Sequence, residues 1–288
     1  MRKRFIGYPR IIQTTIVSLL TLLLLIVGVV GTSALAHGAT AAGTSAPMHT
    51  ATMGRASLQH TPTGTVNLHA DRHVLTVTIT LIGLAPNSTH PAHIHVGNSC
   101  ASNGAILYPL NNVVADAKGQ ASVTTFVHIS KPGIPAMGWY VNVHNGPTLA
   151  TPHQANAIAC GVISNTYNAS DVLTFLGPTS SPNQHAAGYT NLYIKNGRLV
   201  VHIIVTGLAP YSKHAAHIHA GNCFYTRQVL FDLSPLVANA QGVASKTESF
   251  NHVTSIPASG WVVNVHFSTD LSTQTGYDPI LCGNVINA

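Results

Sequence analysis

The feature that most constrains the fold of this chain is an internal repeat, which covers most of the sequence. Short motifs of one half return in the other in the same order, at an offset that drifts only from 124 to 122 residues. The matches are Gly-Leu-Ala-Pro at 83–86 and 207–210, His-Ile-His at 93–95 and 217–219, Gly-Trp at 138–139 and 260–261, Val-Asn-Val-His at 141–144 and 263–266, and Cys-Gly at 160–161 and 282–283. This pattern indicates a tandem duplication. We therefore predict a first repeat at 62–164, a polar linker at 165–185 and a second repeat at 186–288.

Within each copy the sequence reads as a series of short strands. Segments 74–80 and 199–205 are β-branched runs that stop at the Gly-Leu-Ala-Pro turns. Further short runs, bounded by Gly, Pro or Asn, occupy 121–128, 139–144 and 159–163. No window shows a convincing helical period. Many short strands in about 100 residues predict an all-β fold, with one β-sandwich or barrel per copy.

The first 36 residues have the layout of a secretory signal peptide. A basic start precedes an apolar run at 16–30, and small residues end in Ala34-Leu35-Ala36, which predicts cleavage after Ala36. An uncleaved N-terminal anchor is the alternative, and it would be the chain's contact with a membrane. Residues 37–61 are rich in Ala, Thr, Gly and Ser and are predicted to be a flexible lead-in. Either way, the remainder is expected to be secreted or extracytoplasmic, where cysteines can pair.

The net charge of +6 does not indicate a nucleic-acid-binding protein. Four of the 13 basic residues lie in the first ten positions, whereas all seven acidic residues come after residue 70. The rest of the chain is therefore nearly neutral, with nine basic and seven acidic residues. Because no basic patch remains to bind phosphates, we exclude nucleic acid as a partner.

The four cysteines fall two in each copy. Cys100 and Cys160 are 60 residues apart, and Cys223 and Cys282 are 59 apart in matching places. This spacing favours one disulfide within each copy over disulfides between copies. A loop of this length would stabilise a domain by roughly 4 kcal/mol in the chain-entropy model.

The duplication also selects among the 18 histidines, which are too many to interpret singly. Four positions hold His in both copies: His90 with His214, His93 with His217, His95 with His219, and His144 with His266. His128 and His252 form a fifth pair if a gap of one residue is allowed.

The His-x-His pattern points to a metal site. In a strand, His93 and His95 project from one face while Ile94 projects from the other. A third imidazole from a neighbouring strand would complete a site, and His144, at the end of a strand, is the candidate. Neutral imidazole suits copper, zinc and nickel, whereas calcium and magnesium need oxygen ligands. The alternative is a set of partly buried histidines that are hydrogen-bonded to the backbone.

Taken together, these motifs resemble the Cu/Zn superoxide dismutases. Residues 81–86, followed by His90, the His-Ile-His motif, Gly97 and Cys100, resemble the copper-site strand of that family. Residues 159–163 are similar to its C-terminal strand, which holds the second half of the family's disulfide. The same segments also resemble the chordin-type CHRD domain, through His-Ile-His-x-Gly at 93–97 and Tyr-Val-Asn-Val-His at 140–144. The resemblance covers about 62–164 and 186–287.

The resemblance implies a set of site residues and a fold. It makes His93, His95 and His144 the copper ligands of the first copy. The same roles fall to the matched residues His217, His219 and His266 in the second. His90 and His214 would hold a ligand strand in place by hydrogen bonding. Each copy would be a Greek-key sandwich with one structural disulfide and one copper ion, and zinc is not expected.

Departures from the family pattern argue against efficient dismutation. Between Cys100 and Gly119 there is no His and one acid, Asp116, and the second copy has only Asp232 in the corresponding stretch. The zinc ligands and the bridging His are therefore missing. The family's guiding Arg is replaced by Ala157 and Pro279. We assign no catalytic residue, and superoxide dismutase activity is expected to be weak or absent.

The sequence thus predicts a secreted or surface-attached copper-binding protein of two superoxide-dismutase-like domains. One alternative is a non-catalytic, CHRD-like structural or adhesion module, in which the histidines form a buried hydrogen-bond cluster without metal. A second alternative is a copper-only superoxide dismutase. It would need a fourth ligand, for which His128 and His252 are the paired candidates. The sequence identifies no protein partner.

Overall fold

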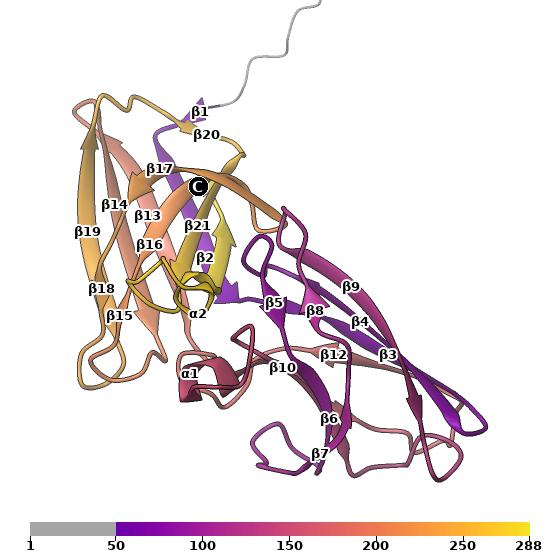
Figure 1. Ribbon diagram of the computed structural model, residues 1–288. Coiled ribbons are helices and arrows are strands. Elements are labelled where there is room, and N and C mark those ends of the chain that lie inside the picture. The colour runs from indigo at the N-terminus through magenta and orange to yellow at the C-terminus, as the bar shows by residue number, and fades with distance from the viewer. Residues whose placement is uncertain (1–49) are drawn as a thin grey trace, which may run out of the picture. The chain divides into compact units, whose positions relative to one another are not determined.

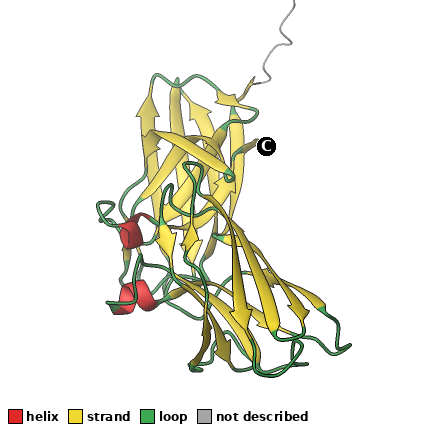
Figure 2. Cartoon of the chain, turned by 45° about the vertical axis from the view of Figure 1, so that its right-hand side comes forward, coloured by secondary structure: helices red, strands yellow, loops and turns green. Residues whose placement is uncertain are grey.

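The computed structural model describes residues 50–288 (Figure 1). The predicted signal peptide or anchor at 1–36, and the part of the lead-in before residue 50, lie outside the described residues. Within residues 50–288, no helix is long and apolar enough to cross a membrane. This part of the chain is built from antiparallel sheets and two four-residue helices, so the prediction of an all-β protein is confirmed (Figure 2).

The first copy contributes two four-stranded antiparallel sheets. One has the order β12-β3-β4-β9 and the other the order β11-β10-β6-β7. Their strands are β3 (Thr63–Asp71), β4 (Val74–Ile82), β9 (Gln120–His128), β12 (Asp171–Leu176), β6 (Ala92–Val96), β7 (Ile106–Pro109), β10 (Trp139–His144) and β11 (Ala157–Ile163). A small pair, β5 (Thr89–His90) and β8 (Val113–Val114), lies beside them in sequence.

The second copy is built around one nine-stranded sheet, which curls like a half-barrel (Figure 1). Its order is β17-β16-β21-β22-β2-β13-β14-β19, with β23 paired to β2. The strands are β17 (Tyr225–Asp232), β16 (Ala216–Asn222), β21 (Trp261–His266), β22 (Pro279–Asn284), β2 (Met53–His60), β13 (Ala187–Lys195), β14 (Arg198–Thr206), β19 (Ala244–Asn251) and β23 (Ile286–Asn287). Two short pairs are β15 (Lys213–His214) with β18 (Leu236–Val237), and β1 (Thr50–Ala51) with β20 (Ile256–Pro257).

Each copy has its own hydrophobic core. In β4 and β14 alternate side chains are fully buried, as a strand with one face on a core requires. The first core is formed by residues between 66 and 176, and the second by residues 56–58 and residues between 186 and 285. The strands predicted at 74–80, 199–205, 121–128, 139–144 and 159–163 are all confirmed, with bounds that differ by no more than two residues.

Two short helices were not predicted from the sequence. They are α1 (Pro152–Ala155) and α2 (Gln274–Tyr277). The first lies directly before β11 and the second directly before β22. Thr151 and Thr273 cap them, because each side chain accepts a hydrogen bond from a backbone N–H of the first turn. A helix of four residues is about one turn, which is too short to produce a detectable hydrophobic period.

Two segments predicted to be flexible or linking are strands instead. β2 lies within the predicted lead-in at 37–61, and β12 lies within the predicted linker at 165–185. Exposed and buried residues alternate in both strands, so each is a half-buried strand, and β12 exposes the apolar side chains of Leu173 and Phe175. Both strands lie outside the predicted repeats at 62–164 and 186–288.

Each copy carries one disulfide, as the spacing predicts. Cys100 is bonded to Cys160 and Cys223 to Cys282, with Cα–Cα distances of 5.9 and 5.8 Å. Among the described residues no cysteine is free. The cysteines are therefore occupied as cross-links and are not available as metal ligands.

Candidate metal centres

The ligand strands place the paired histidines on one face by simple alternation. In the first copy β6 pairs with β10, so that His95 faces Tyr140 and His93 faces Asn142. Ile94, between the two histidines, is fully buried in the core. The same register recurs between β16 and β21 in the second copy. The two histidines of β6 therefore lie on the same face of the sheet as Tyr140 and Asn142 of β10.

The third histidine lies at a local irregularity of its strand. The pairing of β10 with β11 shifts register between Val143 and His144, and that of β21 with β22 shifts between Val265 and His266. Such irregularities re-aim a side chain at the end of a ladder. In both copies the shift brings this histidine beside the His-x-His pair.

The structure brings the six matched histidines together as two separate triplets. In the first triplet His93, His95 and His144 have ring centroids 5.2, 5.7 and 6.0 Å apart. The second triplet, which repeats this arrangement at 5.3, 5.4 and 6.2 Å, consists of His217, His219 and His266. In each triplet one ring nitrogen per residue lies within 4.8 Å of the others. All six side chains are buried, so each triplet is a compact, enclosed set of nitrogen donors.

Backbone carbonyls fix the tautomers of two rings in the first triplet. Nδ1 of His95 lies 2.9 Å from the carbonyl oxygen of Gly104, and Nδ1 of His144 lies 2.7 Å from that of Ala155. A carbonyl can only accept, so each Nδ1 carries the proton and each Nε2 keeps a free lone pair. Ala155 is the last residue of α1, where a carbonyl has no partner within the helix. The helix end thus orients His144.

The second triplet is held in the same way. Nδ1 of His219 donates to the carbonyl oxygen of Arg227 at 2.9 Å, and Nδ1 of His266 donates to that of Tyr277 at the end of α2. Six other ring nitrogens at the two centres are buried without a hydrogen-bond partner: Nε2 of His95, His144, His219 and His266, and Nδ1 of His93 and His217. Each triplet therefore aims three unpartnered buried nitrogens at one point.

Burial lowers the pKa of five triplet histidines below the usual value: His93, His144, His217, His219 and His266. Burial, followed by the neighbouring rings His144 and His95, lowers the pKa of His93 to about 4. Burial together with the other two rings of its triplet lowers the pKa of His266 to about 4. Neutral imidazole is the form that binds metal. The lowered pKa values favour the neutral form of these rings, and a cation would satisfy the unpartnered nitrogens of each triplet.

His90 and His214, which the resemblance makes supports of a ligand strand, each contact the third histidine of a triplet. Nδ1 of His90 donates to the carbonyl oxygen of His144 at 2.9 Å, and Nε2 lies 2.7 Å from Ser88 Oγ. His214 makes the matched contacts with His266 and Ser212 at the same distances. Both rings are fully buried. They contact the backbone of a triplet residue without taking part in either triplet.

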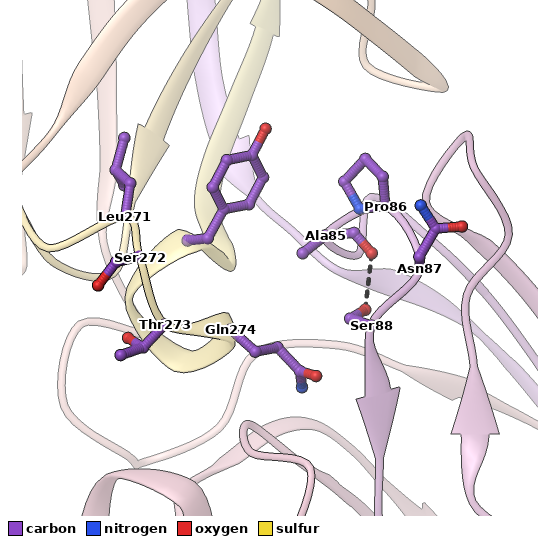
Figure 3. A pocket seen from close by; sticks show the side chains of 9 residues that line it. Ala85, Pro86, Asn87, Ser88, Leu271, Ser272, Thr273 and Gln274 are labelled. Atoms are coloured by element: carbon purple, nitrogen blue, oxygen red, sulfur yellow. Dashed lines mark hydrogen bonds between the residues drawn. The ribbon is translucent and has the colours of Figure 1, made fainter.

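A polar contact between the copies reaches this network. The buried carboxyl of Asp278 accepts a hydrogen bond from the backbone N–H of Ala85 at 3.2 Å and lies 3.9 Å from Nε2 of His90. Burial raises the pKa of Asp278 well above its usual range. The adjoining pocket in Figure 3 is lined by residues 85–88, 271–274 and Tyr277, and none of the six triplet histidines lines it. This pocket is thus separate from the two histidine triplets.

The two centres differ next to the first ligand. In the second copy His217 pairs across the sheet with Asp232, whose carboxylate lies 3.7 Å from the ring Nε2. In the first copy His93 pairs with Pro109. The second centre thus has a carboxylate beside one ligand that the first lacks.

The candidate fourth ligands are not brought to the centres. His128 stacks on His73 with ring centroids 5.9 Å apart, at the far end of β9, and His252 is exposed in a turn after β19. Neither belongs to a triplet. In the part of the chain that the structure describes, each centre is a set of three histidines.

Sequence reasoning missed one side chain that supports the first centre. The Tyr140 ring stacks on His95 at 5.0 Å, and its hydroxyl donates to Ser102 and accepts from the N–H of Gly104. Tyr140 therefore fixes the loop whose carbonyl orients His95. The second copy has Val262 at this place, so a search for residues matched between the copies discards the tyrosine.

No protein-family model matches the sequence, and no curated protein matches it. The case for a metal centre therefore depends on the two triplets themselves.

Proposed function

We propose that this protein binds two transition-metal ions, one in each triplet, and that the ion is copper. The observation that carries the proposal is the convergence of three buried, unpartnered ring nitrogens in each copy. Leaving such groups unpaired is costly. A metal ion at each centre would satisfy all three nitrogens at once, and the proton on the opposite nitrogen of two rings is already held by a carbonyl.

The donor set supports copper over other ions. Each triplet offers imidazole nitrogens and neither carboxylate nor thiolate. Calcium and magnesium need oxygen ligands, and structural zinc is usually closed by four ligands. Three imidazoles suit copper, which also binds nitrogen sites most tightly among the divalent first-row metals. When bound, copper would supply one-electron redox chemistry, while the chain's own residues bind it, orient it and limit its contact with water.

The wider setting of the proposal follows from the sequence motifs. We propose that each copy is a Greek-key sandwich of the superoxide-dismutase type, and that the chain is secreted or attached to a surface by its N-terminus. One disulfide in each copy is consistent with an extracytoplasmic protein. His90 and His214 are proposed to position the third ligand through its backbone. Each centre has three histidines, so a role in metal binding is favoured over rapid dismutation.

The alternative is a structural cluster of histidines that binds no metal. A structural cluster would give its ring nitrogens hydrogen-bond partners, as those of His90 and His214 have. In the triplets the facing nitrogens have no such partner. This contrast between paired and unpaired histidines, within one molecule, favours metal binding over the adhesion or structural role.

The test is the metal content of the mature chain, residues 37–288, with its disulfides intact. The protein is equilibrated with copper and zinc together, desalted and analysed for both metals. The expected result is two copper ions per chain, one for each triplet, and no zinc. Loss of His128 and His252, both outside the triplets, serves as the control and should leave the copper content unchanged. Retention of no metal would overturn the proposal and leave the structural role.

A further inference from the structure

The strands β2 and β12 occupy equivalent places in the two copies. Leu176 of β12 pairs with Gly64 of β3, and Leu58 of β2 pairs with Gly188 of β13. Gly64 and Gly188 are matched positions, 124 residues apart. Each strand therefore runs along the same edge of its copy in the same register.

The other edge of the two strands is equivalent as well. Cys160 of β11 bridges to Gly177, directly after β12, whereas Cys282 of β22 pairs with Gln59 of β2. These two cysteines are the matched halves of the disulfides. Both strands thus fill the same gap between the same two neighbours.

A matched glycine in each copy makes room for this strand. A Cβ on Gly161 would lie 2.6 Å from the carbonyl oxygen of Phe175 in β12. A Cβ on Gly283 would lie 2.3 Å from the carbonyl oxygen of Ser57 in β2. Real Cβ atoms do not approach so closely, so each seam is shaped to admit a neighbouring backbone.

β2 is a structural part of the second copy. Its buried residues alternate with exposed ones, and Ala56 and Leu58 are each only 1% exposed within the second core. Figure 1 shows the strand, in violet, among the orange and yellow strands of that sheet. Without β2, the nine-stranded sheet would be split between β13 and β22.

The source of the strand differs between the copies. The first copy is completed by the strand that follows it in the chain, whereas the second is completed by a strand that precedes the first. Only Thr61 and Pro62 connect β2 to β3. The second copy is therefore assembled from two segments that are separated by the whole first copy.

We propose that the seam between β13 and β22 is a strand-acceptor site whose ligand is β2. When the chain's own β2 is defective, the β2 of another molecule of this protein occupies the site in trans. The recognition is that of β-augmentation: main-chain hydrogen bonds along both edges, with small and apolar side chains at alternate positions. In the intact chain the tethered strand has an effective concentration in the millimolar range, so its own β2 occupies the site. The inference does not depend on metal binding.

The first test compares matched substitutions in the full chain by hydrogen exchange. Leu58→Asp should increase exchange in β13 and β22 of the second copy and leave β3 and β4 of the first protected. Leu176→Asp, the matched change in β12, should do the reverse. If Leu58→Asp instead loosened the first copy, or left both copies protected, β2 would not be the donor strand. If the aspartate variants yield no soluble protein, the Leu→Ala variants at the same positions are compared by the same criterion.

The second test asks whether the strand acts in trans. A synthetic peptide of residues 50–61, added at up to about 1 mM, the range that a tether would provide, should restore protection in the Leu58→Asp chain. Emission from Trp261, read in a Trp139→Phe background, should return with it. The peptide carrying Leu58→Asp is the control and should have no effect. Failure of the unmodified peptide to restore either signal would overturn the acceptor site.

The third test uses two complete chains. Leu58→Asp has a defective donor and an open acceptor, whereas Gly283→Val has an intact donor and a blocked acceptor. The mixture should elute from size exclusion as a one-to-one complex, which neither chain forms alone. Independent elution of the two chains would contradict exchange between copies.

Discussion

The two copies reach almost the same triplet of imidazoles from different surroundings. Their ring separations agree to within 0.3 Å, although one copy is a continuous segment and the other takes in a distant strand. What they share is the register of the His-x-His strand, the register shift at the third histidine and a helix-end carbonyl behind it. We infer that these three features set the geometry of each centre. Residues around the centre can then adjust its affinity for a metal ion.

Removing the third histidine should have the largest effect and should treat the two copies alike. His144→Ala or His266→Ala leaves two imidazoles at its centre, so the copper content should fall from two ions per chain to one. The double variant should retain none. Metal analysis after desalting gives the answer, with circular dichroism to confirm that the strands remain. An unchanged copper content in either single variant would remove that triplet from the account.

The carboxylate of Asp232 should separate the two centres. A carboxylate beside a ligand imidazole raises its basicity, and loss of such a partner typically costs 10–100-fold in metal affinity. Because Asp232 is partly exposed and lies 3.7 Å from His217, we expect Asp232→Asn to weaken the second centre by about tenfold, at the low end of that range. Competition with a copper chelator measures the two affinities.

The reciprocal change sharpens this comparison. Pro109→Asp places a carboxylate at the matched position of the first copy. It should raise the copper affinity of that centre and so reduce the difference in affinity between the two centres. If Asp232→Asn weakened both centres equally, the effect would be one of overall charge, and the proposed asymmetry would be wrong.

Tyr140 should matter at the first centre only. Tyr140→Phe removes the hydroxyl that holds the Ser102–Gly104 loop, at a cost of about 1 kcal/mol for a hydrogen bond. The ring still stacks on His95, so we expect copper affinity at the first centre to fall only several-fold. The second centre, with Val262 at this place, should not change. Tyr108→Phe, a half-buried tyrosine of β7, is the control.

The smallest effect concerns the turns that precede the centres. Asp278 anchors the N–H of Ala85, whereas the matched N–H of Ala209 is anchored by the amide oxygen of Asn183 at 2.7 Å. Burial raises the pKa of Asp278, so folding keeps it protonated where the unfolded chain ionises. The free energy of unfolding should therefore fall as pH rises above about 4, the usual pKa of Asp, until the folded-state pKa is passed. The nearby His90 has its pKa lowered to about 4 by burial and supplies no compensating charge.

The variant Asp278→Asn provides the matched comparison, because it copies the anchor of the second turn. Relative to the wild type, its unfolding free energy should rise with pH over this interval and level off above it. Urea unfolding at a series of pH values measures the difference. Curves that stay parallel throughout would show that Asp278 does not titrate with folding.

The strands and the grouping of the histidines could be predicted from the sequence because both depend on local patterns. The run at 74–80 alternates apolar residues in the way that β4 buries them, and the His-Ile-His motif places its rings on one face without further information. The duplication then filters the histidines, since a residue needed by both centres returns at the same offset.

What the sequence could not reveal depends on contacts between distant segments. β2 is mostly polar or small in composition and β12 has only six residues, so only their partners show which copy each completes. The carbonyls of Ala155 and Tyr277 orient ligands through backbone atoms, which leave no side-chain signature. Tyr140 and Asp232 each act in one copy, so the filter that finds the ligands discards them.

The most direct test of the two-centre account is a crystal structure of the copper-loaded chain with anomalous diffraction recorded at the copper edge. The account predicts two anomalous peaks per chain. One should lie within bonding distance of His93 Nδ1, His95 Nε2 and His144 Nε2. The other should lie at the matched atoms of His217, His219 and His266. Peaks at other sites, or triplets without a peak in copper-loaded crystals, would contradict it.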